Sequence, residues 1–219
     1  MTSRPLAPPD IERLNARVKR SWAKQAPRYD KQIDFFERRV FGRSHRSWAC
    51  SRASGETLEV AIGTALNLRH YADDVRLVGI DLSADMLAFA KERAAKTGRD
   101  IDLREGDAQA LPFDEGSFDT VVCTYSLCNI PDPQRAVNEM KRVLKPGGRL
   151  ILVDHIRAAV RPVLWLQKAL EFFTARLEGE HATRRPADQV ETAGFNIVER
   201  ERLAFAGVVE RLVAVKQNH

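Results

Sequence analysis

Apolar side chains recur along this chain with two different periods, and each period predicts a different kind of element. Residues 10–24 repeat them every three or four positions, which predicts an amphipathic helix with Asp10 as its N-cap. A second helical segment is expected over residues 31–43. These segments predict an N-terminal helical arm or lid over residues 1–54, followed by the main domain over residues 55–219.

Strand and helix signals alternate in the main domain. Short apolar runs predict strands over residues 57–62, 75–81, 101–105, 118–124 and 149–153. The segments between them predict helices over residues 65–71, 83–97 and 134–144. This βαβα order is typical of a parallel sheet with right-handed crossovers.

The pattern changes after residue 155. A long amphipathic helix is expected over residues 161–177 and a short one over residues 186–193. Two final strands, over residues 195–203 and 208–216, predict a closing hairpin. Such a hairpin after five alternating units is unusual for dinucleotide-dependent dehydrogenases.

Length and composition fit one α/β domain with a short appendage. The chain has 219 residues, of which 44% are hydrophobic and 30% charged. No apolar stretch reaches the roughly 18 residues that span a bilayer, and the first residues lack the apolar core of a secretory signal. Cys50, Cys123 and Cys128 form neither a paired framework nor metal-ligand spacing, so we expect a cytoplasmic protein without a bound metal.

The net charge of +5 is concentrated at the N-terminus, where residues 1–52 hold 13 lysines and arginines against 5 acidic residues. A basic arm can contact anionic lipid or form a solvated helix face, and the sequence leaves both interpretations open. Nucleic acid is the less favoured partner because no base-reading motif accompanies the charge. Peripheral contact with an anionic membrane is therefore one hypothesis for this arm.

Three successive predicted strands end in residues suited to a nucleotide-like ligand. The first ends in a tight turn at Gly63, where the backbone can approach a ligand closely. The second ends in Asp81, 22 residues after Glu59, where a carboxylate can accept hydrogen bonds from both hydroxyls of a ribose. The third is followed by Asp107 and Ala108, whose side chain and backbone N–H can bond an adenine edge. Open α/β sheets place their ligands at such strand ends.

These motifs resemble those of the class I S-adenosylmethionine (SAM)-dependent methyltransferases. The similar segments are residues 59–64, 79–83, 106–113, 118–119 and 144–148, within a region of about 160 residues. The resemblance implies an α/β, Rossmann-like sheet of seven strands, mostly parallel with an antiparallel last strand, helices on both faces and an N-terminal helical lid. It also implies SAM as the cofactor and S-adenosylhomocysteine as its product.

The resemblance also implies roles for individual residues. Glu59 and Gly63 line the methionine end of SAM, Asp81 holds the ribose, Asp107 and Ala108 frame the adenine, Thr124 lies near the sulfonium, and Ala61 and Leu82 complete the cofactor-binding set. Arg28-Tyr29-Asp30 is similar to the lid element of quinone-type methyltransferases, in which the tyrosine approaches SAM.

Two alanines depart from the family pattern. Ala61 and Ala65 stand where the commonest motif has glycine. We expect Ala61 to be a mild change if its φ is negative, and the methyl group of Ala65 to lie close to the cofactor carboxylate, where it weakens binding or shifts the loop.

A finer resemblance concerns the acceptor. Residues 122–128 and Asp154-His155 are similar to the branch with lipid-associated alkyl thiol methyltransferases and bacterial phosphatidylethanolamine N-methyltransferases. A base is needed only if the acceptor arrives protonated. His155, oriented by Asp154, is our candidate, with a purely structural histidine as the alternative and His181 as a second candidate at the rim.

We therefore expect an enzyme that transfers a methyl group from SAM to a small, rather apolar acceptor with a sulfur, nitrogen or oxygen nucleophile. One alternative is a phospholipid headgroup N-methyltransferase at the membrane surface, and another is a SAM-binding module without activity. An NAD-dependent oxidoreductase is disfavoured because residues 61–66 do not supply the G-x-G-x-x-G turn.

Overall fold

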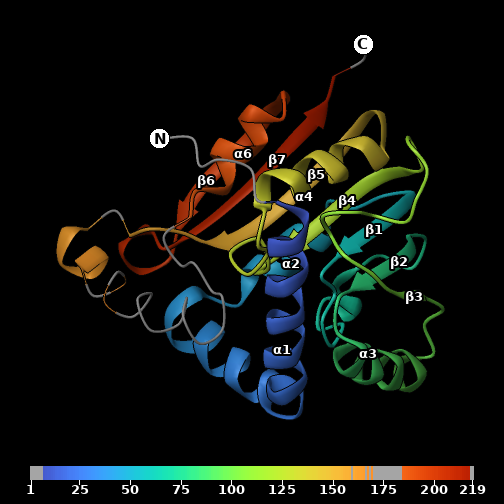
Figure 1. Ribbon diagram of the computed structural model, residues 1–219, viewed down its shortest axis with the longest axis horizontal. Helices are drawn as coiled ribbons and strands as arrows, with labels where there is room; N and C mark the ends of the chain where they lie inside the picture. The colour runs from blue at the N-terminus through green and yellow to red at the C-terminus, as the bar shows by residue number, and fades with distance from the viewer. Residues whose placement is uncertain (1–6, 159, 166, 168, 170–183, 218–219) are drawn as a thin grey trace.

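A seven-stranded sheet forms the centre of the computed structural model, which describes residues 7–158, 160–165, 167, 169 and 184–217 (Figure 1). Its order is β3-β2-β1-β4-β5-β7-β6. The strands are β1 (Glu56–Val60), β2 (Arg76–Asp81), β3 (Asp102–Glu105), β4 (Phe118–Thr124), β5 (Leu144–His155), β6 (Phe195–Leu203) and β7 (Val209–Lys216). Strands β1 to β5 pair in parallel, whereas β7 runs antiparallel to β5 and β6. The predicted sheet and its antiparallel last strand are confirmed.

Helices cover both faces of the sheet, as predicted. They are α1 (Pro8–Phe36), α2 (Ser44–Cys50), α3 (Ala84–Thr97), α4 (Pro133–Val143) and α6 (Pro186–Thr192). Side chains of α2 and α3 share one buried cluster with Val122, while α4 and α6 share another with Val121 and Cys123. In Figure 1, α4 and α6 lie above the sheet and α3 lies below it. Strand β4 is buried at nearly every residue because helices cover both faces of the sheet there, whereas most residues of the edge strands β3 and β6 are exposed or only partly buried.

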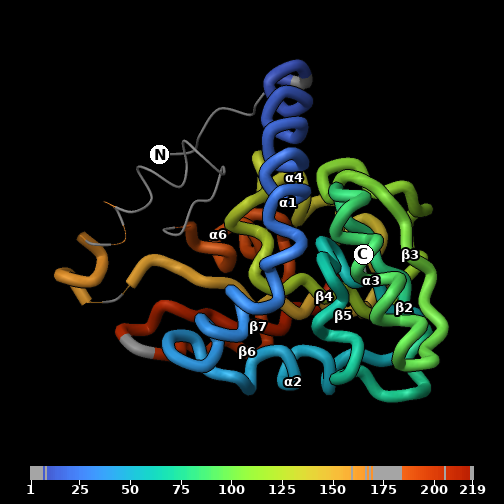
Figure 2. The backbone as a smooth tube through the Cα atoms, turned by 90° about the horizontal axis from the view of Figure 1, so that it is seen from below, coloured from blue at the N-terminus to red at the C-terminus, as the bar shows by residue number. Residues whose placement is uncertain are grey.

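The N-terminal arm differs from the prediction of two separate helices. Helix α1 runs without a break through Pro27 to Phe36 and continues into a π-helical turn, η1 (Glu37–Phe41). Contacts at both ends hold it against the main domain: Asn15 bonds Asp107, and Asp30 bonds Thr64. Figure 2 shows the N-terminal half of α1, in dark blue, extending past the rest of the molecule. These tertiary contacts outweigh the local tendency of proline to end a helix.

The helix predicted over residues 65–71 is absent. Turns and a single 3-10 segment, η2 (Leu68–His70), occupy this position instead. Ala65 has a φ of +59°, and a right-handed helix cannot begin through a left-handed residue. The prediction was wrong because the helix propensity of alanine gives no indication that Ala65 adopts a left-handed backbone conformation.

Most of the helix predicted over residues 161–177, together with His181, lies outside the described residues. Of that helix the structure describes residues 161–165, 167 and 169. Within the described part of the chain, no helix is long and apolar enough to cross a membrane.

Candidate active site

A pocket opens where the carboxyl ends of the parallel strands meet helix α1. It encloses about 670 Å³, including space open to solvent. Seven of the eleven predicted site residues line it: Tyr29, Ala61, Gly63, Asp81, Leu82, Asp107 and Ala108. Glu59, Thr124, Asp154 and His155 are not part of this lining. The strand ends are thus brought together as the sequence predicts, and the remaining four residues lie behind or beside the wall.

Asp81 presents a carboxylate at the end of β2. One of its oxygens accepts the N–H of Gly63 at 2.8 Å, and the other accepts the N–H of Ser83 at 2.9 Å. Burial raises the pKa of Asp81 to about 6, although these N–H groups and that of Leu82 act in the opposite direction. Each oxygen keeps a lone pair beyond its backbone bond, so the group can accept hydrogen bonds from a ligand hydroxyl.

Asp107 shares its carboxylate with the arm. Asn15 of α1 donates to Oδ2 at 2.7 Å, and the backbone N–H of Gln109 donates to Oδ1 at 2.9 Å. The side chain of Gln109 also donates to Asp107 and to Asn15. The edge of an adenine bound here would therefore form hydrogen bonds with the Asp107 carboxylate, which Asn15 of α1 already holds in place.

Helix α1 forms the outer wall of the pocket. Val18, Trp22 and Tyr29 face it, and Trp22 meets Tyr29 edge-to-face with ring centroids 5.6 Å apart. Asp30 accepts a hydrogen bond from Thr64 at 2.6 Å and pairs with Arg93 of α3. The arm thus closes one side of the pocket with apolar and aromatic surface.

The turn after β1 has an unusual backbone. Gly63 adopts a φ of +59°, as glycine readily does, but Ala61 and Ala65 also have positive φ values of +54° and +59°. The condition under which Ala61 would be a mild change is therefore not met. Each alanine in this region costs about 1–3 kcal/mol, a strain that clusters at functional sites.

Ala65 is fully buried in the cluster beneath the turn. We expected its methyl group beside the ligand, but it is not among the residues that line the pocket. The substitution therefore fills core space under the turn instead of narrowing the pocket.

Glu59 lies beneath the turn at only 2% exposure. Its oxygens accept hydrogen bonds from the Asn67 side chain and the Tyr71 hydroxyl, both at 2.8 Å. Asn67 also donates to Thr124 at 3.0 Å, so both predicted residues belong to one buried network. Burial raises the pKa of Glu59 to about 7, against the lowering effects of Tyr71, Arg46 and Asn67.

This pKa predicts how Glu59→Gln changes stability with pH. Because the folded-state pKa lies above the ordinary value of 4.5, ionisation opposes folding, and the wild type loses stability as pH rises through about 7. The glutamine cannot ionise and keeps an acceptor oxygen. We expect its melting temperature to exceed that of the wild type by a few degrees at pH 8 and by little at pH 5.

Thermal melts of both proteins between pH 5 and 8 measure this difference. Glu56→Gln, on the exposed carboxylate that pairs with Arg76 at the start of β1, is the matched control. An offset for Glu59→Gln that is the same at every pH contradicts the prediction.

Arg46 is a buried residue behind the pocket wall, outside the lining itself, that sequence reasoning missed. It lies in α2 at 5% exposure and donates to Glu37 at 2.5 Å, to Asn67 at 2.9 Å and to Thr124 at 3.4 Å. Its guanidinium carbon is 5.2 Å from the ring centroid of Tyr125, which lines the pocket. These partners are up to 78 residues away in sequence, and no local motif marks the arginine.

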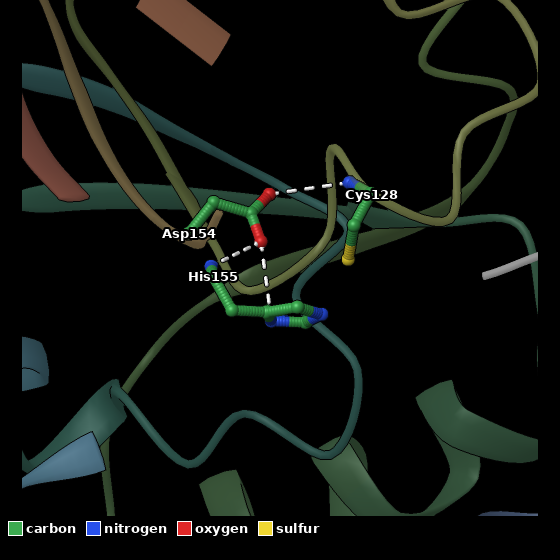
Figure 3. Close-up of side chains that lie close together, drawn as sticks. All are labelled: Cys128, Asp154 and His155. Atoms are coloured by element: carbon green, nitrogen blue, oxygen red, sulfur yellow. Dashed lines mark hydrogen bonds and ion pairs between the residues drawn. The ribbon is translucent and has the colours of Figure 1, made fainter. Parts of the chain in front are cut away.

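His155 and Asp154 lie together at the end of β5, as predicted (Figure 3). The His155 Nδ1 atom is 3.4 Å from Asp154 Oδ1, which also accepts the backbone N–H of His155 at 2.8 Å. The imidazole stacks on Phe41 with centroids 5.8 Å apart and lies 6.4 Å from Tyr125. His155 therefore lies outside the pocket lining but beside Tyr125, which belongs to that lining.

Cys128 joins this pair through the fold. Its backbone N–H donates to Asp154 at 3.2 Å, and the potential ligand atoms of Cys128, Asp154 and His155 lie within 4.8 Å of one another. Both oxygens of Asp154 already accept backbone N–H groups, which fixes the carboxylate for its neighbours. Burial raises the pKa of Asp154, while His155 acts to lower it. The arrangement fits an imidazole that a carboxylate orients.

Comparison with known proteins identifies the family. Residues 58–152 match the model of a family described as a methyltransferase domain. This chain carries a class I SAM-dependent methyltransferase domain. The domain is 40% identical over 121 residues to a phosphatidylethanolamine N-methyltransferase of Cereibacter sphaeroides, covering 54% of this chain and 60% of the relative. It is 36% identical over 143 residues to a demethylmenaquinone methyltransferase of Deinococcus radiodurans, covering 63% and 59%. The match thus spans about six tenths of these relatives.

Solved structures share the fold of this methyltransferase domain. A SAM-dependent methyltransferase of Thermotoga maritima aligns with a TM-score of 0.66 at 19% identity, covering 90% of this chain and all of that one (100%). A [4+2]-cyclase aligns with a TM-score of 0.65 at 21% identity, covering 80% and 79%. Proteins named for two different reactions share this fold, so the fold does not determine the reaction. The reaction has to be inferred from the residues of the site.

The pocket of the methyltransferase domain fits SAM, the cofactor that the family implies. Asp81 offers a carboxylate with spare lone pairs where ribose hydroxyls would donate, and Asp107 and Ala108 line the position of a base. Gly63 lacks a side chain where the turn meets the pocket, and only Met86 lies near its missing Cβ, at 3.6 Å. The roles of the individual residues remain predictions.

Proposed function

We propose that this protein is a SAM-dependent methyltransferase that acts on a small, lipophilic acceptor. The observation that carries the proposal is the pocket at the strand ends, where Gly63, Asp81 and Asp107 converge beneath α1. When bound, SAM supplies a methyl group on a sulfonium that is primed for displacement. The protein must chiefly hold an acceptor atom in line with that bond, at roughly 3 Å.

The residues of the chain divide this work between two regions. Asp81 and Asp107 hold the adenosine end, while Tyr29 and Trp22 cover the pocket and keep water out. Next to Tyr125, Asp154 orients His155 to take a proton from an acceptor that arrives protonated. A thiol or an amine would need this step, whereas an acceptor that is already ionised would not.

Aromatic side chains support a lipophilic acceptor. Phe41 stacks on Tyr125 and on His155, and Phe36 stacks on Phe41 with centroids 5.9 Å apart. This series runs from the exposed Phe36 to the imidazole and offers apolar contact along its length. Two relatives are named for acting on phosphatidylethanolamine and demethylmenaquinone, both lipophilic molecules.

Two measurements in sequence test the proposal. Calorimetry with SAM should show binding, and release of S-adenosylhomocysteine, corrected for hydrolysis, should then rise with an acceptor from a panel of apolar thiols, amines and phenols. No binding of SAM would overturn the assignment. Binding without turnover on any acceptor would favour the alternative of a SAM-binding module without activity.

Phospholipid headgroup methylation at a membrane surface is a second candidate function. Phe35 and Phe36 at the end of α1 and Val40 in η1 are exposed at 56%, 46% and 39%, and η1 also exposes Arg38 and Arg39. Apolar and basic side chains on one helical segment are typical of an interfacial contact with anionic lipid. In Figure 2 this segment follows α1 near the outer surface of the molecule.

This candidate predicts binding to vesicles. The protein should sediment with liposomes containing phosphatidylserine, bind phosphatidylcholine liposomes less, and dissociate at high salt. The double variant Phe35→Ser, Phe36→Ser should lose most of this binding. Val198→Ser, on a residue 58% exposed in β6, is the matched control and should bind like the wild type. If the wild type fails to bind both lipid compositions at low salt, the membrane candidate is wrong.

A further inference from the structure

Arg46, the buried arginine of the arm, has one guanidinium nitrogen without a hydrogen bond within 3.5 Å among the described residues. Arg46 Nη2 is buried and has no hydrogen-bond partner among the described residues, although Nε and Nη1 are both bonded. The hydroxyl of Tyr125 nearby is also buried without a partner in the described part of the chain. Buried donors left unsatisfied cost about 1–3 kcal/mol each, so such groups commonly await a ligand or an ordered water.

The position of Arg46 along the sheet indicates which part of a ligand would reach it. Asp107 follows β3, Asp81 ends β2, and Thr124 ends β4 on the other side of β1. A ligand whose base lies at β3 and whose ribose lies at β2 extends its far end toward β1 and β4. Arg46 donates to Thr124 at this end of the row. In SAM, the group farthest from the base is the amino-acid end.

The charges around Arg46 favour an anion over a cation. Glu37 neutralises one edge of the guanidinium, and Asn67 and Thr124 occupy one nitrogen of the other edge. The remaining nitrogen, Nη2, carries part of the positive charge and has no hydrogen-bond partner within 3.5 Å among the described residues. Tyr29, which lines the pocket, interacts with Arg46: burial raises the pKa of the Tyr29 hydroxyl, and the charge of Arg46 and a side-chain hydrogen bond to it lower this pKa.

We infer that Arg46 binds the α-carboxylate of SAM through Nη2, with the Tyr125 hydroxyl as a second donor. The inference rests on the proposed function, because it takes SAM as the ligand. Arginine matches a carboxylate through charge-assisted hydrogen bonds, and burial strengthens them. Arg46 also bonds Glu37 of η1, so the bound carboxylate would tie the N-terminal arm to the cofactor.

A comparison of two ligands tests the inference by binding alone. Calorimetry measures S-adenosylhomocysteine and its decarboxylated analogue, which keeps the adenosine, the sulfur and the amine but lacks the carboxylate. The wild type should bind S-adenosylhomocysteine about tenfold or more tightly than the analogue. In Arg46→Gln this ratio should fall to near one, because only the carboxylate-bearing ligand loses its partner. Arg46→Lys, which keeps the charge, should give an intermediate ratio.

Arg52→Gln is the matched control. Arg52 lies just after the same helix, but it pairs with Glu199 away from the pocket, and its variant should keep the wild-type ratio. Melting temperatures of all variants separate loss of the fold from loss of the subsite. Arg46→Lys keeps the positive charge within the buried network, so its ratio tests the position if Arg46→Gln does not fold; a wild-type ratio in Arg46→Lys would overturn the inference.

The outcomes distinguish this inference from the proposed function. If the wild type binds neither ligand, the SAM assignment itself is wrong. If the wild type binds both ligands equally, the pocket has no carboxylate subsite and the inference is overturned while SAM binding stands. If Arg46→Gln weakens both ligands by the same factor, Arg46 acts only by holding Glu37, Asn67 and Thr124 in place, and the inference is equally overturned.

Discussion

Asp81→Asn should weaken binding of S-adenosylhomocysteine by about 1–3 kcal/mol, or roughly 5- to 150-fold. The carboxylate already accepts the N–H groups of Gly63 and Ser83, and its remaining lone pairs face the pocket. An asparagine has one acceptor oxygen and cannot keep both backbone bonds while it also accepts two ribose hydroxyls. The variant therefore loses ligand contacts and part of the preformed turn.

The pH dependence of binding gives a second readout of the same residue. Asp81 has a pKa of about 6, and its ionised form is the better acceptor for hydroxyl groups. Affinity of the wild type should therefore fall as pH drops below about 6, and ligand binding should release a proton in that range. Asp81→Asn should show neither effect, because the amide does not titrate.

Asp102→Asn provides the control for Asp81. Asp102 lies at the amino end of β3, the end of the strand away from Asp81. Its side chain is half-exposed and pairs with Arg104. Calorimetry of both variants at pH 5.5 and 8 makes the comparison. Wild-type affinity in Asp81→Asn would show that the ribose does not lie at β2, and with it the placement of the base and of the amino-acid end would be lost.

The sequence predicts those site residues that follow directly after a recognisable strand or turn pattern. Gly63, Asp81 and Asp107 each follow a short apolar strand, and parallel strands bring their carboxyl ends to one edge. Strand period and turn chemistry therefore suffice to place them together. The antiparallel last strand follows in the same way from two alternating runs near the C-terminus.

Other features depend on contacts between distant residues and could not be predicted. Arg46 reaches Thr124, and Asn15 reaches Asp107, across 78 and 92 residues. Helix α1 passes through Pro27 because both of its ends are held by the main domain. The missing helix after Ala65 follows from a left-handed backbone that alanine seldom adopts. In each case tertiary structure overrides a local propensity.

His155→Asn should lower kcat on the order of 100-fold or more with an acceptor that arrives protonated. The imidazole lies beside Asp154 and against the rings of Phe41 and Tyr125, with 13% of its side chain exposed, so it can take a proton from an acceptor held next to it. Binding of SAM should change little, because His155 does not line the pocket that holds Asp81 and Asp107. The loss should shrink as pH rises toward the pKa of the acceptor, since an ionised acceptor needs no base.

Initial rates across pH 6 to 10, with calorimetry of SAM, separate this role from a structural one. His70→Asn, on a histidine of η2 away from the pocket lining, is the matched control and should keep the wild-type profile. Asp154→Asn should reduce kcat as well, because it removes the carboxylate that orients the ring. A His155→Asn profile parallel to that of the wild type at every pH would mean that the histidine only packs against Phe41 and Tyr125. The proton would then have to leave the acceptor through solvent before the methyl group is transferred.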